Sequence, residues 1–211
     1  MTRPARDTRP GRPGGAAGPS VGSRPAPPLP MTDLDSALDR LDAARDAFLA
    51  RIGALTDAQR AFRPAPDAWS PVEVAEHVWR VEAGLARGLD KQVQAGPDRR
   101  DLGPRTPGGI DRLAQAMRSG GRMRMPERAA PHIAPQGAAW DDVRAGWRAT
   151  GREWRRVAGT VPDALAEVGV LGHPLAGPLT PAEGARFAEL HAEHHDRQLD
   201  RIAAAPGFPA A

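Results

Sequence analysis

The chain has 211 residues, of which 40% are hydrophobic, and this is enough apolar material for one domain with a buried core. It contains no cysteine, so disulfide bonds and thiolate metal ligands are excluded, and any metal ion must be held by histidine or carboxylate side chains. No apolar run approaches the roughly 20 residues of a membrane span, and no apolar segment follows the N-terminal arginines as it would in a secretory signal. We therefore expect a cytoplasmic protein without membrane association.

The formal net charge of +3 is unevenly distributed. Residues 1–30 are rich in Pro, Gly, Ala, Ser and Arg, and they carry five arginines and one aspartate. This composition cannot bury enough apolar surface to offset the entropy of ordering, so it predicts a disordered tail. The rest of the chain is close to neutral, whereas a nucleic-acid-binding domain clusters positive charge on its folded part. We therefore predict a tail over 1–30, a domain over 31–205 and no nucleic-acid partner; translation starting at Met31 is the alternative explanation of the tail.

The first predicted helix begins with Thr32 or Asp33 as its N-cap and ends near Gly53. Its apolar residues recur at alternating spacings of three and four, which is typical of a helix that faces a core. Arg45 is the one break in this stripe. The stripe consists of Leu34, Leu38, Leu41, Phe48, Ile52 and Leu55.

The second predicted helix has a complete start signal. Ser70 is its N-cap, Pro71 occupies the first helical position, and Glu73 closes a capping box. Gly96-Pro97 ends it. His77 lies on its apolar face, one turn from valines on either side, and is expected to point inward. The apolar face consists of Val74, Val78, Val81, Leu85, Leu89 and Val93.

Residues 97–137 form a long Pro/Gly-rich link with a short helix predicted near Ile110–Arg118. A link of this length in a compact domain is usually functional or disordered. Its arginines outnumber its acidic residues, and two interpretations follow. The arginines contact an anionic cofactor or acidic substrate, or the link is a solvated charged loop. The arginines are at positions 99, 100, 105, 112, 118, 122, 124 and 128.

Two further helices complete the predicted fold. The third ends around Gly159 and carries Trp140, Trp147 and Trp154 on its core face. The fourth repeats the start device of the second, with its N-cap at Thr180. No alternating strand pattern of useful length is present. Four amphipathic helices with polar links predict an all-α four-helix bundle. The inward stripe of the fourth helix is Ala188, His191, His195, Leu199 and Ile202.

Three histidines are the best candidates for chemistry. His191 and His195 are four residues apart, which places both rings on one face of a helix about one turn apart. His77 can supply a third nitrogen from the second helix, and three protein ligands with an open position are common at catalytic zinc sites. His191 with His194 is an alternative pair, and hydrogen-bonded core histidines are the alternative to any metal. Imidazole suits zinc, nickel and iron alike, and the sequence identifies no general base.

Other residues receive simpler interpretations. Trp69 is expected to be a packing anchor before the second helix, and His132 to be exposed. Trp79 is expected at the bundle surface or in a homodimer interface. His173 precedes the last helix, where it either shapes the loop or lines the site.

Three segments resemble the DinB-like superfamily of small bacterial four-helix bundles. That family includes metal-dependent thiol S-transferases and the mycothiol-dependent maleylpyruvate isomerase. The resemblance implies an up-down-down-up helix order and metal ligands that correspond to His77, His191 and His195. It also implies a transferase or isomerase that uses a low-molecular-weight thiol and a small-molecule substrate. The alternative is a non-catalytic bundle that binds a partner or ligand. The matching segments are 69–78, 173–180 and 191–199.

Overall fold

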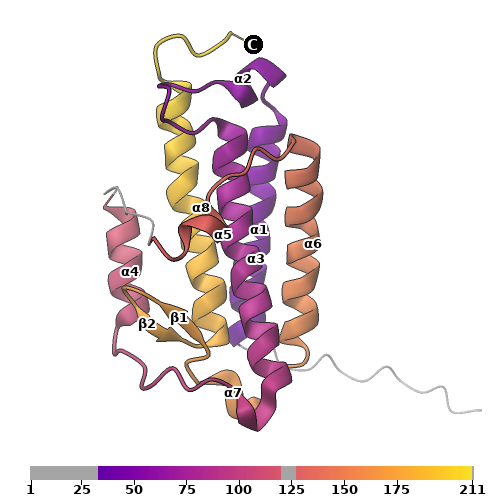
Figure 1. Ribbon diagram of the computed structural model, residues 1–211, viewed down its shortest axis with the longest axis vertical. Coiled ribbons are helices and arrows are strands. Elements are labelled where there is room, and N and C mark those ends of the chain that lie inside the picture. Colours follow the sequence, from indigo (N-terminus) through magenta and orange to yellow (C-terminus); the bar gives the residue numbers. More distant parts are fainter. Residues whose placement is uncertain (1–32, 120–126, 211) are drawn as a thin grey trace, which may run out of the picture. The chain divides into compact units, whose positions relative to one another are not determined.

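The computed structural model describes residues 33–119 and 127–210, so the predicted tail lies outside the described residues. Four long helices lie side by side in Figure 1. α1 and α8 run in one direction and α3 and α6 in the other, which gives the predicted up-down-down-up order (Figure 1). The predicted four-helix bundle is therefore confirmed. The long helices are α1 (Asp33–Gly53), α3 (Pro71–Ala95), α6 (Trp140–Ala158) and α8 (Pro181–Ala203).

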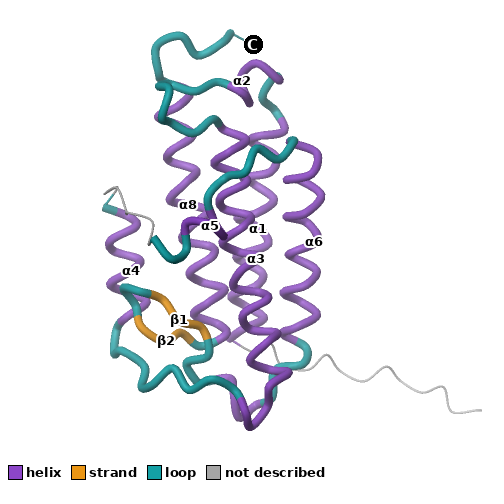
Figure 2. The backbone as a smooth tube through the Cα atoms, viewed as in Figure 1, coloured by secondary structure: helices purple, strands orange, loops and turns teal. Residues whose placement is uncertain are grey.

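Short elements connect the long helices (Figure 2). Two of them form an antiparallel hairpin in which Leu171 lies opposite Leu179. The prediction that no strand of useful length exists missed this hairpin, because each strand has only three residues and cannot display an alternating pattern. The short elements are α2 (Asp57–Ala61), η1 (Gly96–Asp98), α4 (Gly109–Arg118), α5 (Ala130–Ile133), α7 (Asp163–Ala166), β1 (Leu171–His173) and β2 (Gly177–Leu179).

The starts of α3 and α8 are fixed by the two predicted capping boxes. The Ser70 hydroxyl accepts the Glu73 N–H, and the Glu73 carboxylate accepts the Ser70 N–H at 2.8 Å. Thr180 and Glu183 make the same reciprocal pair at 3.1 and 2.9 Å. Each box satisfies N–H groups that a helix end would otherwise leave unpaired. These caps therefore determine the register of the two helices that carry the candidate histidines.

The core consists of two apolar clusters with polar groups between them. The first contains Leu41 on α1, and the second contains Phe48, two turns along the same helix. Arg45 lies between these two positions and is buried, with 4% of its surface exposed. On α8, His191 and His195 likewise fall between Ala188 of the first cluster and Leu199 of the second. The middle of the bundle is therefore polar, although it is closed to solvent.

Two helices of the link between α3 and α6 pack onto the bundle. The predicted short helix is present as α4, and it packs on α8 through the buried side chains of Leu113, Ala114 and Met117. α5 packs on α3. Arg105 pairs with Glu183 at 2.5 Å. The arginines at 100, 105, 112, 118 and 128 are nevertheless exposed, so a solvated charged surface stays a prediction for this link; Arg122 and Arg124 lie outside the described residues.

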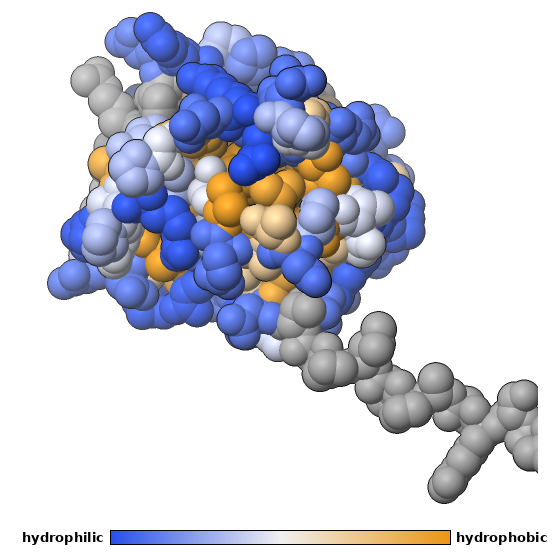
Figure 3. Space-filling view, turned by 90° about the horizontal axis from the view of Figure 1, so that it is seen from below, coloured by the Kyte–Doolittle hydropathy of each residue, from blue (hydrophilic) through white to orange (hydrophobic). Residues whose placement is uncertain are grey.

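Among residues 33–119 and 127–210, Leu175 is the one large apolar residue that is exposed. Figure 3 views the bundle from the α7 end, where an apolar area is surrounded by hydrophilic residues. Trp79 is half-buried: its ring packs against Gly146 on α6, and its N–H donates to the Thr150 hydroxyl at 3.1 Å. These contacts occupy Trp79 within its own chain, and a homodimer stays a prediction. None of the described helices is both long and apolar enough to cross a membrane.

Candidate metal centre

The structure brings His77, His191 and His195 together in the middle of the bundle. His77 lies in the second turn of α3, and the other two lie on consecutive turns of α8. One ring nitrogen from each comes within 4.8 Å of the other two. The Nε2 atoms of His191 and His195 are 3.2 Å apart. All three residues are buried, with 6–8% of their surface exposed.

Hydrogen bonds to oxygen atoms show which ring nitrogen carries the proton in His77 and His195. His77 Nδ1 lies 2.8 Å from the backbone oxygen of Ile133, and His195 Nδ1 lies 2.7 Å from Oε1 of Gln198. Since carbonyl and amide oxygens only accept, both Nδ1 atoms donate, and each neutral ring keeps its lone pair on Nε2. A histidine that donates its second nitrogen to a carbonyl is typical of metal ligands.

Burial keeps these rings neutral. It lowers the pKa of His77 and His191 below the usual value of 6.5, and it lowers the pKa of His195 to about 3. His195 and His77 also disfavour a positive charge on His191 and lower its pKa further. Neutral imidazole is the form that binds a metal ion, so the cluster offers lone pairs at any pH near neutrality.

Aromatic rings line the histidine cluster on two sides. The Trp69 ring lies 4.9 Å from the His77 ring, so the predicted packing anchor packs on the candidate site itself. Phe187 lies between His191 and His173, at centroid distances of 5.7 and 4.5 Å. His173 Nδ1 accepts the backbone N–H groups of Leu175 and Ala176, which fixes the turn between β1 and β2. The loop-shaping role expected for His173 is therefore present, one ring away from the cluster.

The comparison with protein families identifies the fold family. The model of the DinB superfamily matches residues 40–199. The chain belongs to the DinB superfamily. No functionally curated protein matches it in sequence. Among solved structures, the four-helix bundle protein TT2238 is similar, with 26% identity over 78% of this chain and 97% of its own. The TM-score of that match is 0.42.

Within this DinB superfamily chain, His194 does not join the cluster. Its Nδ1 lies 3.0 Å from the backbone oxygen of Met117, and Arg197 donates to the same oxygen at 2.8 Å. Both side chains therefore attach the end of α4 to α8. The alternative pair of His191 with His194 is not the arrangement found, since the group of converging nitrogens contains His77, His191 and His195. His132 is exposed, as expected.

The carboxylates nearest to the histidines in sequence are directed elsewhere. Glu73 belongs to the cap of α3, and Glu76 accepts backbone N–H groups of residues 136–138. Asp196 pairs with Arg51 at 2.9 Å. Glu193 is exposed and lines a groove on the other side of α8. None of these four carboxylates is placed as a general base for the cluster.

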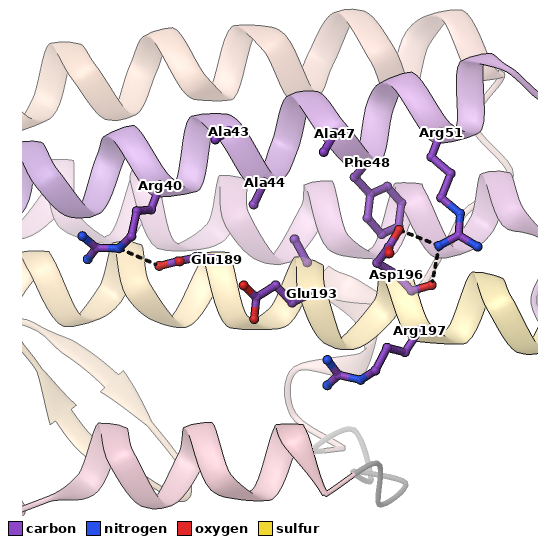
Figure 4. A pocket seen from close by; sticks show the side chains of 11 residues that line it. Arg40, Ala43, Ala44, Ala47, Phe48, Arg51, Glu189, Glu193, Asp196 and Arg197 are labelled. Atoms are coloured by element: carbon purple, nitrogen blue, oxygen red, sulfur yellow. Dashed lines mark hydrogen bonds and ion pairs between the residues drawn. The ribbon is translucent and has the colours of Figure 1, made fainter.

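That groove, of about 640 Å³, runs between α1 and α8 (Figure 4). Its ends are marked by the Arg40–Glu189 and Arg51–Asp196 pairs, and alanines line it between them (Figure 4). None of the three clustered histidines lines it. The groove and the cluster thus use different faces of α8.

Sequence reasoning missed a buried polar network beside the cluster. Arg45 pairs with Glu82 at 2.7 Å, and the Trp147 N–H donates to the other oxygen of Glu82 at 2.6 Å. The available signal was the break at Arg45 in an otherwise apolar stripe. A charged residue on a core face requires a buried partner. Glu82, next to Val81 on the core face of α3, is the acidic residue that could have been predicted as this partner.

Proposed function

We propose that the chain binds one divalent metal ion through His77, His191 and His195. The observation that carries this proposal is the convergence of three buried, neutral imidazoles, one ring nitrogen of each lying within 4.8 Å of the other two. Buried polar nitrogens are costly unless they have a partner. A common cation would satisfy all three at once.

The donor set fits such an ion. Two nitrogens bound to one tetrahedral zinc ion at 2.0–2.1 Å lie about 3.3 Å apart, and the Nε2 atoms of His191 and His195 are 3.2 Å apart. His77 and His195 already have their protons on Nδ1, which leaves Nε2 free to bind an ion. His191 differs, because in the metal-free chain its Nε2 is the one left to donate a proton to His195. That proton has to move to Nδ1 for His191 to bind an ion. Zinc, nickel and iron all accept this ligand set.

We further propose that the DinB superfamily chain is a thiol-dependent S-transferase or isomerase acting on a small-molecule substrate. A divalent ion held by neutral ligands lowers the pKa of a bound thiol or water. The chain's own residues support a reaction whose nucleophile arrives with the cofactor, because the carboxylates nearest in sequence to the cluster are directed elsewhere. Trp69 and Phe187 provide apolar walls that exclude water beside the rings.

The direction of these carboxylates, away from the histidine cluster, also favours a second candidate function. A cluster without a general base fits a non-catalytic bundle in which the metal stabilises the fold and the groove between α1 and α8 receives a ligand or partner. The two candidates differ in whether a thiol is consumed.

The experiment that separates them measures conjugation of low-molecular-weight thiols with an electrophile such as 1-chloro-2,4-dinitrobenzene. The panel includes glutathione, cysteine and mycothiol, and the protein is loaded with zinc, nickel or iron. The enzyme proposal predicts turnover with at least one thiol that is lost on chelation and returns with metal. Fully loaded protein that shows no metal-dependent turnover with any thiol would support the non-catalytic bundle instead.

A further inference from the structure

A buried carboxylate next to the histidine cluster holds the segment that follows α5. Glu76 is 1% exposed. One of its oxygens accepts the N–H of Gln136 at 2.9 Å, and the other accepts the N–H groups of Gly137 and Ala138 at 3.0 Å each. Gly137 has a φ of 80°, in the left-handed region. Three consecutive N–H groups directed at one carboxylate form an anion-binding nest, which here is filled by the chain itself.

The held segment also contains the hydrogen-bond partner of His77. The backbone oxygen of Ile133 lies 2.8 Å from His77 Nδ1. One residue earlier, the backbone oxygen of His132 accepts a hydrogen bond from Arg80 at 3.1 Å. The Ile133 oxygen is therefore bracketed by two anchors, Arg80 before it and Glu76 after it, and both anchors flank His77 on α3.

The position of the Ile133 oxygen determines which nitrogen of the His77 ring carries the proton. A carbonyl can only accept, so its position opposite Nδ1 places the proton there and leaves the lone pair on Nε2. Burial alone would keep the ring neutral without choosing between its two nitrogens. If the segment moved away from α3, His77 would lose the hydrogen bond to Ile133 that distinguishes Nδ1 from Nε2.

We infer that Glu76 is a positioning residue for His77, which acts by holding residues 133–138 so that the Ile133 oxygen fixes the orientation and tautomer of the His77 ring. The consequence for metal affinity rests on the proposed function. Groups that orient a metal-binding histidine typically change metal affinity by about 10- to 100-fold when removed. The consequence for the tautomer does not depend on a metal, and it can be measured in the metal-free chain.

The variant Glu76→Gln is nearly isosteric, and it replaces one accepting oxygen with a donating amide. Gly137→Ala disturbs the same segment from the opposite side. A Cβ on Gly137 would meet nothing within 4 Å, so this substitution acts only through the left-handed backbone that alanine disfavours. Glu82→Gln is the matched control, because Glu82 is also 1% exposed and on α3 but contacts Arg45 and Trp147 instead.

The test combines nitrogen-15 NMR of the histidine rings with amide hydrogen exchange, both on the full metal-free chain. Wild type is expected to show His77 protonated at Nδ1 and slow exchange at residues 136–138. Glu76→Gln and Gly137→Ala should each speed exchange there at least tenfold and shift His77 towards a mixture of tautomers, whereas Glu82→Gln should do neither. Zinc affinity, measured by competition with a chelator, should fall by about 10- to 100-fold in the first two variants only.

An unchanged His77 tautomer in Glu76→Gln would overturn the inference, even if exchange at 136–138 became faster, because Glu76 would then stabilise the segment without positioning the ring. Failure of the proposed function has a different signature. A wild-type chain that binds no zinc, but whose His77 tautomer depends on Glu76, would contradict the metal site and support the positioning role.

Discussion

The Arg45 guanidinium donates two hydrogen bonds to the same oxygen of Glu82, at 2.7 and 3.1 Å, in the middle of the bundle. Removing one member of a buried ion pair leaves an uncompensated charge and typically costs about 3–5 kcal/mol. We expect Arg45→Met to lower the free energy of unfolding by about this amount, because Glu82 keeps only the Trp147 N–H. The double variant with Glu82→Leu should be less destabilised than Arg45→Met alone, since no charge is then left buried.

Urea denaturation of the metal-free chain measures both effects. Arg155→Met is the matched control, because Arg155 pairs with Asp39 and Asp42 in partly exposed positions. Such pairs contribute less than about 1 kcal/mol. A double variant as unstable as the sum of its two single variants would contradict this account of the network.

Two glycines in long helices should respond to alanine in opposite ways. A Cβ on Gly146 would lie 2.2 Å from the Trp79 ring, whereas one on Gly84 would meet nothing within 4 Å. Gly146→Ala should therefore force Trp79 to move and lower the free energy of unfolding by about 1–3 kcal/mol. Gly84→Ala should raise it by about 0.5–1 kcal/mol, because alanine is the better helix former. Thermal unfolding of the two variants measures these changes. Equal changes in the free energy of unfolding would show that Trp79 is not held against α6.

Much of the fold could be predicted because its signals are local. The capping residues Ser70 and Thr180 begin helices in the structure as predicted, and the apolar stripes of the four long helices line the core. His77, His191 and His195 could be placed on inward faces by the same spacing. The spacing also separated His195 from His194, which lies on a neighbouring face and contacts α4.

The remaining features depend on contacts between distant residues. Ile133 meets His77, and Glu76 meets residues 136–138, across about sixty positions of the chain. No short-range pattern encodes such pairs. The hairpin of β1 and β2 was missed for a different reason, since three-residue strands containing Gly172 and Gly177 carry too little pattern to recognise.

The stability of the metal-free chain should depend on pH between 7 and 5. Burial lowers the pKa of His77, His191 and His195, and that of His173 to about 4, while the unfolded rings titrate near 6.5. Below pH 6.5 the unfolded chain thus binds more protons than the folded chain. The free energy of unfolding therefore decreases as the pH is lowered. Each such ring contributes at most about 1.4 kcal/mol per pH unit.

The variant His195→Leu tests this assignment. In the wild-type chain the pKa of His195 is lowered from the usual 6.5 to about 3. Removing the ring should therefore make the loss of stability between pH 7 and 5 shallower. Denaturant unfolding at several pH values measures the slope. An equal slope in His195→Leu and wild type would show that His195 titrates normally in the folded chain.

Deleting residues 1–30 should leave helicity, melting temperature and metal content unchanged. The segment is rich in Pro, Gly, Ala, Ser and Arg and has no apolar stripe with which to dock on a bundle. Circular dichroism and metal analysis of the shortened chain check this. A clear drop in melting temperature would mean that the domain begins before residue 31.

The central claim concerns the three histidines, and metal content measures it most directly. After purification under native conditions, the account predicts about one divalent ion per chain, as expected for three protein ligands around a single ion. His77→Ala, His191→Ala and His195→Ala should each lower this occupancy, whereas His194→Ala and His132→Ala should leave it close to that of wild type. Full occupancy in His77→Ala would contradict the three-histidine site, and loss of the ion in His194→Ala would assign His194 to the metal in place of His195.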